Sequence, residues 1–255
     1  MRILLTNDDG YHARGLAVLE RIARTLSDDI WVVAPAEEQS GTARALTITK
    51  PVRVRRFDER RFAVTGTPTD AVMMALARLV DPWPDLILSG VNRGANLAED
   101  VSYSGTVSAA MEGAFAGIRS VALSQLYAKA GPGEKVSFAA AEAWGERVLR
   151  PVIAADWAPR TVVNVNFPPI APEEVKGVRV VRQGLRDHGR LKLDHRVDPR
   201  GFDYYWLALQ RMPHDPEPGT DLDAVAQGFV TVTPLHLDLT HEESLSTFER
   251  AMTEG

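Results

Sequence analysis

The stretch Arg2-Ile3-Leu4-Leu5-Thr6-Asn7-Asp8-Asp9-Gly10 opens the chain and decides its fold class. Residues 2–6 form a short apolar run that a polar turn sequence ends, which is typical of a buried strand. The next segment carries apolar side chains at helical spacing, and residues 30–34 form a second apolar run that ends at Pro35. The pattern predicts two parallel strands joined by a helix in a right-handed crossover.

The alternation of strands and helices continues beyond this unit. Strands are expected at residues 86–89, 121–123 and 162–167, and helices at residues 71–80, 105–117 and 134–149. Valine and arginine alternate around residues 52–55, and residues 62–64 supply a partner, so an antiparallel insertion is expected there. The order favours an α/β fold: a Rossmann-like, doubly wound, mostly parallel sheet with an antiparallel insertion.

The pattern becomes less regular after about residue 168. A charged stretch with glycine and proline is expected to form an exposed loop, and strands are expected at residues 178–181, 204–209 and 229–233. A terminal helix is expected at residues 242–252. We therefore divide the chain into a Rossmann-like domain, residues 1–180, and a C-terminal extension, residues 181–255.

The composition restricts the ligands of the protein. The 255 residues include no cysteine, so a metal would be held by oxygen or imidazole, and oxygen ligands favour hard cations. The formal net charge of −5 disfavours a nucleic-acid duplex as a partner and leaves a small anionic substrate. Neither a secretory signal nor a long apolar run is apparent, so we expect a cytoplasmic protein without membrane contact.

Three polar loops follow predicted strands, at residues 6–10, 35–41 and 89–106. The carboxyl ends of parallel strands meet at one crevice, so these loops are expected to converge. Asp8 and Asp9 can approach one ion only if the backbone turns, which Gly10 permits. A divalent cation would offset the repulsion between two carboxylates brought together.

Each of these side chains also has a purely structural interpretation. Asp8 can be a solvated turn residue and Asp9 a helix cap, while Ser104 and Thr106 can cap the helix that follows them. Alternatively, Asn92 can offer an oxygen to a metal, and the amides at the start of that helix can bind a phosphate. Only the combination of the loops favours a metal and phosphate site.

Several segments together carry a family resemblance. They are Leu5-Thr6-Asn7-Asp8-Asp9-Gly10-Tyr11, Gln39-Ser40-Gly41, Ser89-Gly90-Val91-Asn92-Arg93-Gly94-Ala95-Asn96 and Tyr103-Ser104-Gly105-Thr106-Val107, with later echoes at Asn164-Val165-Asn166-Phe167-Pro168 and Gly219-Thr220-Asp221. They resemble the SurE family of stationary-phase survival proteins, which are metal-dependent 5′-nucleotidases. The resemblance spans nearly the entire chain.

The resemblance implies a phosphoric monoester hydrolase that converts nucleoside 5′-monophosphates into nucleoside and phosphate. It implies one divalent cation per subunit, Mg²⁺ or Mn²⁺, and a neighbouring phosphate site. The implied metal ligands are Asp8, Asp9, Ser40 and Asn92, the implied phosphate-binding residues are Asn96, Ser104, Gly105 and Thr106, and the expected catalytic residues are Asp8, Asp9 and Asn96. Without the resemblance, Ser40 would be interpreted as a turn serine.

The resemblance also implies that residues 181–255 contribute to a homodimer, which in similar proteins sometimes pairs into a homotetramer. The amphipathic spacing of the terminal helix does not distinguish this arrangement from a helix that folds back on its own subunit.

Two other functions agree less well with these sequence features. A regulatory protein that binds nucleotides without catalysis gains little from paired carboxylates beside an anionic phosphate. A Rossmann dehydrogenase is disfavoured, because Asn7-Asp8-Asp9-Gly10 replaces its glycine fingerprint. For the reaction, attack by water competes with a carboxylate nucleophile, but the Asp-x-Asp spacing of haloacid-dehalogenase-like phosphatases is not found at this motif.

Overall fold

A computed structural model describes residues 1–127, 137–186, 191–209 and 215–253 of the chain. The described strands of the main sheet are β1 (Ile3–Thr6), β2 (Ile30–Pro35), β3 (Val54–Asp58), β4 (Arg61–Val64), β5 (Leu86–Arg93), β6 (Arg119–Gln125), β7 (Thr161–Phe167), β8 (Val178–Val180) and β11 (Val230–His236). Their spatial order is β3-β4-β2-β1-β5-β6-β7-β11-β8. A separate sheet consists of β9 (Leu191–Val197) and β10 (Asp203–Leu209).

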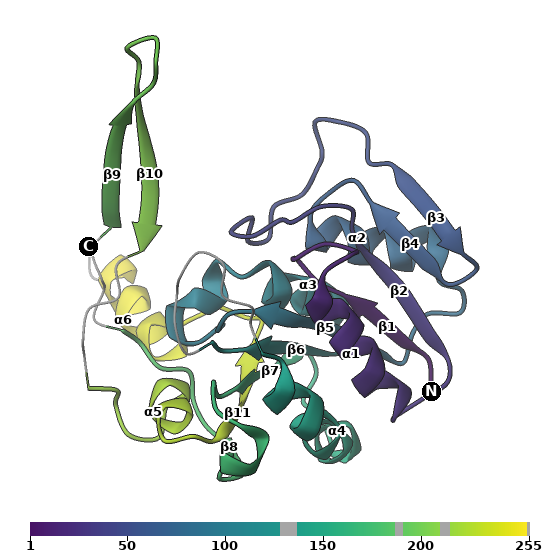
Figure 1. Ribbon diagram of the computed structural model, residues 1–255. Helices are drawn as coiled ribbons and strands as arrows, with labels where there is room; N and C mark the ends of the chain where they lie inside the picture. Colours follow the sequence, from purple (N-terminus) through teal and green to yellow (C-terminus); the bar gives the residue numbers. More distant parts are fainter. Residues whose placement is uncertain (128–136, 187–190, 210–214, 254–255) are drawn as a thin grey trace.

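Helices cover both faces of the main sheet (Figure 1). The described helices are α1 (Arg14–Arg24), α2 (Pro68–Met74), α3 (Gly105–Phe115), α4 (Ala139–Ala154), α5 (Asp221–Ala226) and α6 (Glu242–Thr253), with short helical turns η1 (Ala75–Leu79), η2 (Ala98–Ser102) and η3 (Pro172–Glu174). Helices α1 and α4 pack on one face, and α2 and α3 pack on the other. No helix of the described ranges is long and apolar enough to span a bilayer.

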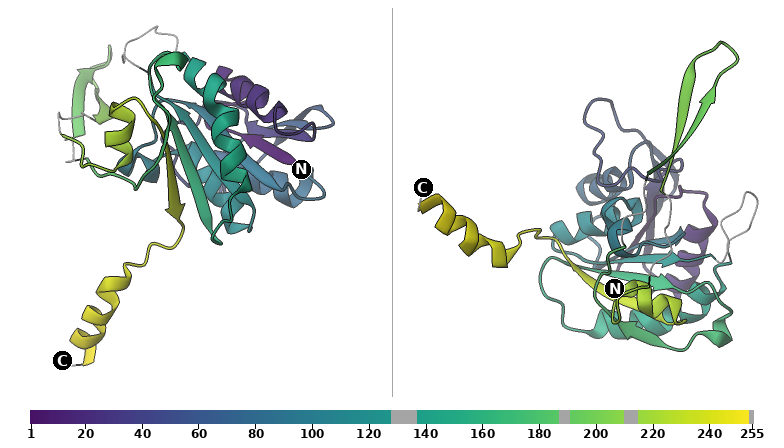
Figure 2. Two further views of the ribbon diagram at one scale, coloured as in Figure 1. Left: turned by 90° about the horizontal axis from the view of Figure 1, so that it is seen from below. Right: turned by 90° about the vertical axis from the view of Figure 1, so that its left-hand side faces the viewer.

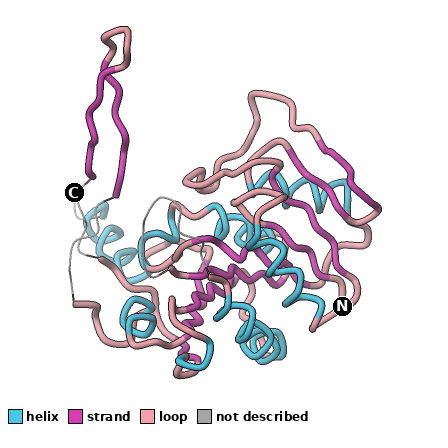
Figure 3. Tube along the Cα trace, viewed as in Figure 1, coloured by secondary structure: helices cyan, strands magenta, loops and turns pink. Residues whose placement is uncertain are grey.

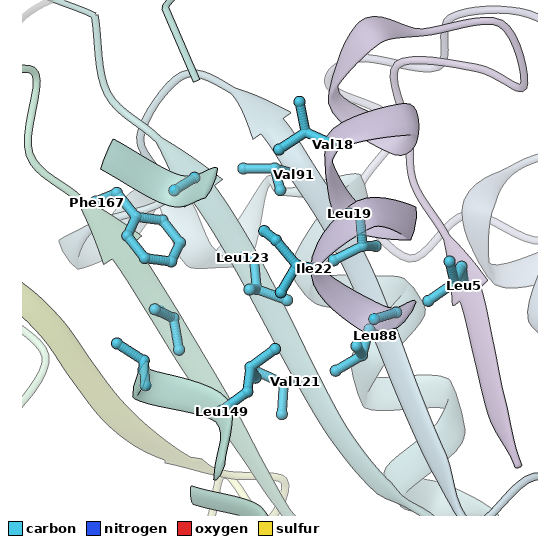
Figure 4. Packing of buried hydrophobic residues seen from close by; sticks show 14 of the residues in the cluster. Leu5, Val18, Leu19, Ile22, Leu88, Val91, Val121, Leu123, Leu149 and Phe167 are labelled. Atoms are coloured by element: carbon cyan, nitrogen blue, oxygen red, sulfur yellow. The ribbon is translucent and has the colours of Figure 1, made fainter. Parts of the chain in front are cut away.

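The first strand is apolar throughout because both of its faces are covered. Ile3 and Leu5 point into the cluster beneath α1 and α4, whereas Leu4 points to the opposite face, as the two-residue period of a strand requires. Figure 4 shows Leu5 close to the side chains that α1 contributes to this core, including Leu19. The parallel pairing of β1 with β2 and with β5 confirms the predicted crossover unit.

The predicted doubly wound, mostly parallel fold with an antiparallel insertion is confirmed. Strands β3 and β4 pair antiparallel at one edge of the sheet, and the segment that joins β2 to β3 is loop throughout (Figure 3). Thr67 caps α2, with Pro68 as the first helical residue. The Asp70 carboxylate accepts the Thr67 N–H at 2.8 Å, which completes a capping box.

In the C-terminal extension, strands that are neighbours in the main sheet do not follow one another along the chain. Strand β11 returns to the main sheet, where it pairs antiparallel with β7 and parallel with β8. The expectation of an exposed loop at residues 186–196 was wrong for residues 191–196, which lie in β9 and pair with β10 in a projecting hairpin (Figures 1 and 2), whereas residues 187–190 of that stretch lie outside the described residues. Strand β9 could not be predicted from an apolar pattern, because a strand of an exposed hairpin can carry charged side chains on both faces. Helix α6 extends away from the sheet in Figure 2 and buries none of its side chains.

Candidate active site

Three loops meet at the carboxyl ends of β1, β2 and β5, as their positions after parallel strands predict. The Gln39 N–H donates to the Asp8 carbonyl at 2.8 Å and joins the second loop to the first. The Arg93 N–H donates to Asp9 Oδ2 at 3.0 Å and brings the end of β5 to the same place. Thr106 Oγ1 donates to Asp8 Oδ1 at 2.5 Å, which adds the start of α3. The aspartate pair therefore lies at the centre of the junction.

The turn that carries the aspartates is held by its first and last residues. Asn7 Nδ2 donates to the Gly10 carbonyl at 2.9 Å. Gly10 has a φ of 96°, and a Cβ atom there would lie 3.1 Å from the Glu37 carbonyl carbon. Sequence reasoning assigned the turn to Gly10 and missed Asn7, although asparagine commonly bonds a backbone group of its own turn.

Asp8 is nearly inaccessible, with 5% of its surface exposed. Burial raises the pKa of Asp8 to about 6; the Thr106 hydrogen bond opposes this rise and the charge of Asp9 adds to it. Burial also raises the pKa of Asp9, while the Arg93 N–H opposes it. A cation would favour the charged form of both groups, so the surroundings of this pair fit a divalent metal.

The N-terminus of α3 faces Asp8 at short range. Gly105 permits this approach, because a Cβ atom there would lie 2.8 Å from Asp8 Cβ and 3.1 Å from Pro68 Cγ. Ser104 Oγ accepts the Val107 N–H at 3.1 Å as the helix cap. The N–H groups of Gly105 and Thr106 lie in the first turn, where no helical carbonyl reaches them. Together with the helix dipole they form a site suited to an anion.

The other two expected metal ligands lie on the adjoining loops. Ser40 is exposed, and its hydroxyl donates to Glu38 Oε1 at 2.9 Å. Glu38 also pairs with the Arg93 guanidinium at 3.4 Å, so it links the second loop to the third, a role that sequence reasoning missed. Asn92 is half-buried, and its Nδ2 donates to the Gly94 carbonyl at 3.1 Å. This bond orients the amide and leaves its oxygen as the atom suited to a cation.

Strand β5 runs four residues past its expected end at residue 89 and thereby carries Asn92. Its register against β6 shifts between Ser89 and Asn92, and Gly90 in this irregularity has a φ of 139°. A Cβ atom at Gly90 would lie 2.3 Å from the Leu123 carbonyl oxygen. Glycine therefore allows β5 to stay against β6 while the strand deforms.

Asn96 lies in a buried network at the ends of β6 and β7. Its N–H donates to Asn166 Oδ1 at 2.9 Å, and its Nδ2 donates to Ser124 Oγ at 2.8 Å. Its carbonyl accepts from Asn164 Nδ2 at 2.7 Å and from Asn166 Nδ2 at 3.1 Å. The sequence singled out the segment with Asn164 and Asn166 only as an echo of the family, although their spacing places both amides on one face of a strand.

Among the described residues, no three His, Cys, Asp or Glu side chains come together as a metal site. A cation beside Asp8 and Asp9 would therefore need neutral oxygen ligands as well, of the kind that Ser40 and Asn92 provide. Carboxylate, hydroxyl and amide oxygens together suit Mg²⁺ or Mn²⁺.

Fold and site together define a doubly wound α/β protein in which two carboxylates lie where three loops meet, and the almost fully buried one, Asp8, faces a helix N-terminus. The model of the family described as Survival protein SurE matches residues 3–190. A protein of Rhizorhabdus wittichii named 5′-nucleotidase SurE is 67% identical over 96% of this chain and 97% of its own length. One of the same name from Erythrobacter litoralis is 57% identical over the same shares.

A solved structure agrees with these relatives. The crystal structure of the SurE protein from Aquifex aeolicus has a TM-score of 0.84 and 38% sequence identity, covering 99% of this chain and 100% of that one. The chain belongs to the SurE family, and the resemblance inferred from its motifs is confirmed.

Proposed function

We propose that this chain is a metal-dependent 5′-nucleotidase that hydrolyses nucleoside 5′-monophosphates in the crevice around Asp8. The reaction class is supported by relatives named 5′-nucleotidase SurE, which match the chain over nearly its full length. The structural observation that carries the proposal is the position of Asp8 between Asp9 and the N-terminus of α3. One carboxylate thus borders both a cation site and an anion site.

The cation site consists of Asp8, Asp9, Ser40 and Asn92, with one Mg²⁺ or Mn²⁺ per subunit. The support is the oxygen chemistry of the four side chains and the two raised carboxyl pKa values. When bound, the cation neutralises the carboxylates, polarises a phosphate oxygen and favours ionisation of a neighbouring water.

The phosphate site consists of Asn96, Ser104, Gly105 and Thr106. The hydroxyl and the backbone N–H of Thr106 both interact with the Asp8 carboxylate, so we assign the main backbone contact with phosphate to the Gly105 N–H and a shared contact to the Thr106 N–H. Ser104 Oγ accepts from Val107 and retains its own proton for a phosphate oxygen. The Asn96 amide nitrogen gives one hydrogen to Ser124 and has a second available.

In the reaction, a water molecule attacks phosphorus opposite the nucleoside oxygen, the ester bond breaks, and one proton of the water ends on the departing nucleoside oxygen, so that nucleoside and phosphate are released. The donors of the phosphate site stabilise the negative charge that develops on the phosphoryl oxygens. Asp8 and Asp9 hold the cation, so we expect direct water attack and no aspartyl-phosphate. The catalytic residues under this proposal are Asp8, Asp9 and Asn96.

We also propose that residues 181–255 contribute to a homodimer, or to a homotetramer built from two dimers. Support comes from apolar side chains left uncovered in one copy: Trp206 on β10 is 61% exposed and Phe248 on α6 is 65% exposed. On β10 the exposed apolar surface is contiguous along the chain, since Tyr205, Trp206 and Leu207 are all exposed, and contiguous apolar surface marks contact sites in proteins.

A substrate panel tests the proposed function. Phosphate release is measured from nucleoside 5′-monophosphates, from 3′-monophosphates and from polyphosphate, with chelator and with Mg²⁺ or Mn²⁺ added. We expect release from 5′-monophosphates that chelator stops and metal restores. Nucleotide binding without release under any of these conditions would favour the regulatory protein instead.

A further inference from the structure

Ala98 adopts a backbone conformation that alanine normally avoids. Its φ is 53°, and it begins the helical turn η2, which lies between Asn96 and Ser104 and precedes α3. Left-handed backbone is unfavourable for a residue with a Cβ atom, so surrounding contacts must hold it. Ala98 is fully buried, so its polar backbone groups need partners from within the protein.

Both backbone groups of Ala98 are satisfied by residues of the C-terminal extension. The Ala98 N–H donates to Asp221 Oδ2 at 2.9 Å, and the Ala98 carbonyl accepts from Gln183 Nε2 at 2.8 Å. Asp221 has no exposed surface, and its other oxygen accepts from the N–H groups of Gly184 and Leu222, each at 2.8 Å. A buried carboxylate needs such donors, so the charge of Asp221 is tied to the position of Ala98.

A second contact holds the next two residues of the loop. The Arg186 guanidinium donates to Glu99 Oε1 at 3.0 Å and lies 2.9 Å from Asp100 Oδ2. The Arg186 N–H donates to the other Glu99 oxygen at 3.0 Å. The Arg186 side chain is only 12% exposed. Screening by water is therefore limited, and this pair fixes the loop more firmly than an open surface pair would.

We propose that Asp221, Gln183 and Arg186 act as positioning residues that hold residues 97–100 and thereby set the spacing between Asn96 and Ser104. This inference rests on the proposed phosphate site. Asn96 is anchored to β7 and Ser104 caps α3, so the segment between them determines whether both reach one phosphate. The extension thus supports catalysis within its own subunit.

The three positioning residues Asp221, Gln183 and Arg186 are called the clamp below, and two single variants test it. Asp221→Asn keeps the shape but turns an amide toward an N–H group, and Gln183→Met removes the bond to the Ala98 carbonyl. We expect each to lower kcat/KM for a nucleoside monophosphate, by about 10- to 100-fold for Asp221→Asn, mainly through kcat. Binding of inorganic phosphate, followed by calorimetry, should weaken in parallel while Mn²⁺ affinity stays unchanged, because three of the four proposed metal ligands lie on other loops and the fourth, Asn92, is held in strand β5.

Rescue separates positioning from a merely structural role. Ala98→Gly adopts a positive φ without strain, so adding it to Gln183→Met should restore part of kcat/KM. The matched control is Arg182→Gln, which removes a surface pair with Glu217 and should leave phosphate binding unchanged. Unchanged kcat/KM and phosphate affinity in both clamp variants would overturn the inference, as would equal losses of Mn²⁺ and phosphate binding. If the wild-type chain releases no phosphate, the proposed function fails, whereas phosphate affinity still tests the clamp.

Discussion

Thr106 Oγ1 and Asp8 Oδ1 are 2.5 Å apart, and the hydroxyl donates to the carboxylate. The bond connects the N-terminus of α3 with the end of β1, so the proposed cation and phosphate sites share one contact. A change at either residue is expected to affect both sites.

Replacing Thr106 with valine tests this shared contact. Valine keeps the shape of the side chain but cannot donate, so Asp8 is left without its hydroxyl partner. We expect kcat to fall by about 10-fold or more, since a hydrogen bond to a charged group contributes about 1.5–3 kcal/mol. Thr106→Ser should retain most activity. The control is Thr233→Val, whose buried hydroxyl has no partner among the described residues; activity equal to wild type in Thr106→Val would contradict the account.

Gly105→Ala tests the close approach of α3. The added Cβ atom would lie 2.8 Å from Asp8 Cβ, so the helix or the turn must shift. We expect a destabilisation of about 1–3 kcal/mol in urea unfolding, with a large loss of kcat. Ala110→Gly in the same helix should cost about 1 kcal/mol of stability yet leave kcat nearly intact. If kcat in each variant fell only as far as its free energy of unfolding did, the close approach of α3 to Asp8 would have no catalytic importance.

The carboxylate of Asp70 makes a contribution to the free energy of unfolding that depends on pH. Burial raises the pKa of this carboxyl, but hydrogen bonds from Thr47 and Thr67 outweigh it, so the pKa lies below its usual value. Because the pKa of Asp70 is lower in the folded chain than in the unfolded chain, the ionised carboxylate stabilises the fold at pH values above the unfolded value of 3.8. This stabilisation is lost as the pH falls through the folded pKa. We expect Asp70→Asn to cost about 1 kcal/mol at neutral pH and progressively less below pH 4.

Unfolding in urea at neutral and acidic pH measures this difference. Glu59→Gln, at an exposed position, is the control and should leave the unfolding midpoint unchanged at both pH values. A cost for Asp70→Asn that grows as pH falls would be inconsistent with the capping interaction.

Ser40→Ala tests the ligand that depends most on family resemblance. Loss of one neutral ligand should weaken Mn²⁺ binding by about 10-fold and be overcome at high metal concentration, because the two carboxylates remain. Titration of activity with Mn²⁺ measures the shift, and Ser27→Ala, whose hydroxyl contacts the Met1 carbonyl, is the control. An unaltered metal dependence in Ser40→Ala would remove Ser40 from the cation site.

Sequence patterns predicted the fold well because buried parallel strands and amphipathic helices have strong periodicity. The capping of α2 by Thr67 is equally local, because it depends on Pro68 and Asp70 within the next three residues. Ser40 could be nominated only through the family, since serine is common in turns. The contacts of Asp221 and Asn166 could not be predicted from the segments that carry them, because their partners Ala98 and Asn96 lie 123 and 70 residues away. Contacts of this kind arise only when the chain closes into a sheet.

The central claim is that Asp8 and Asp9 hold a cation required for hydrolysis. Asp9→Asn tests it most directly, because the asparagine oxygen can still accept the Arg93 N–H and preserve the loop. We predict that this variant melts like wild type but loses on the order of 100-fold or more of its turnover of a nucleoside monophosphate at saturating Mn²⁺. Wild-type turnover in Asp9→Asn, or undiminished turnover of the wild-type chain in metal-depleted buffer, would contradict the claim.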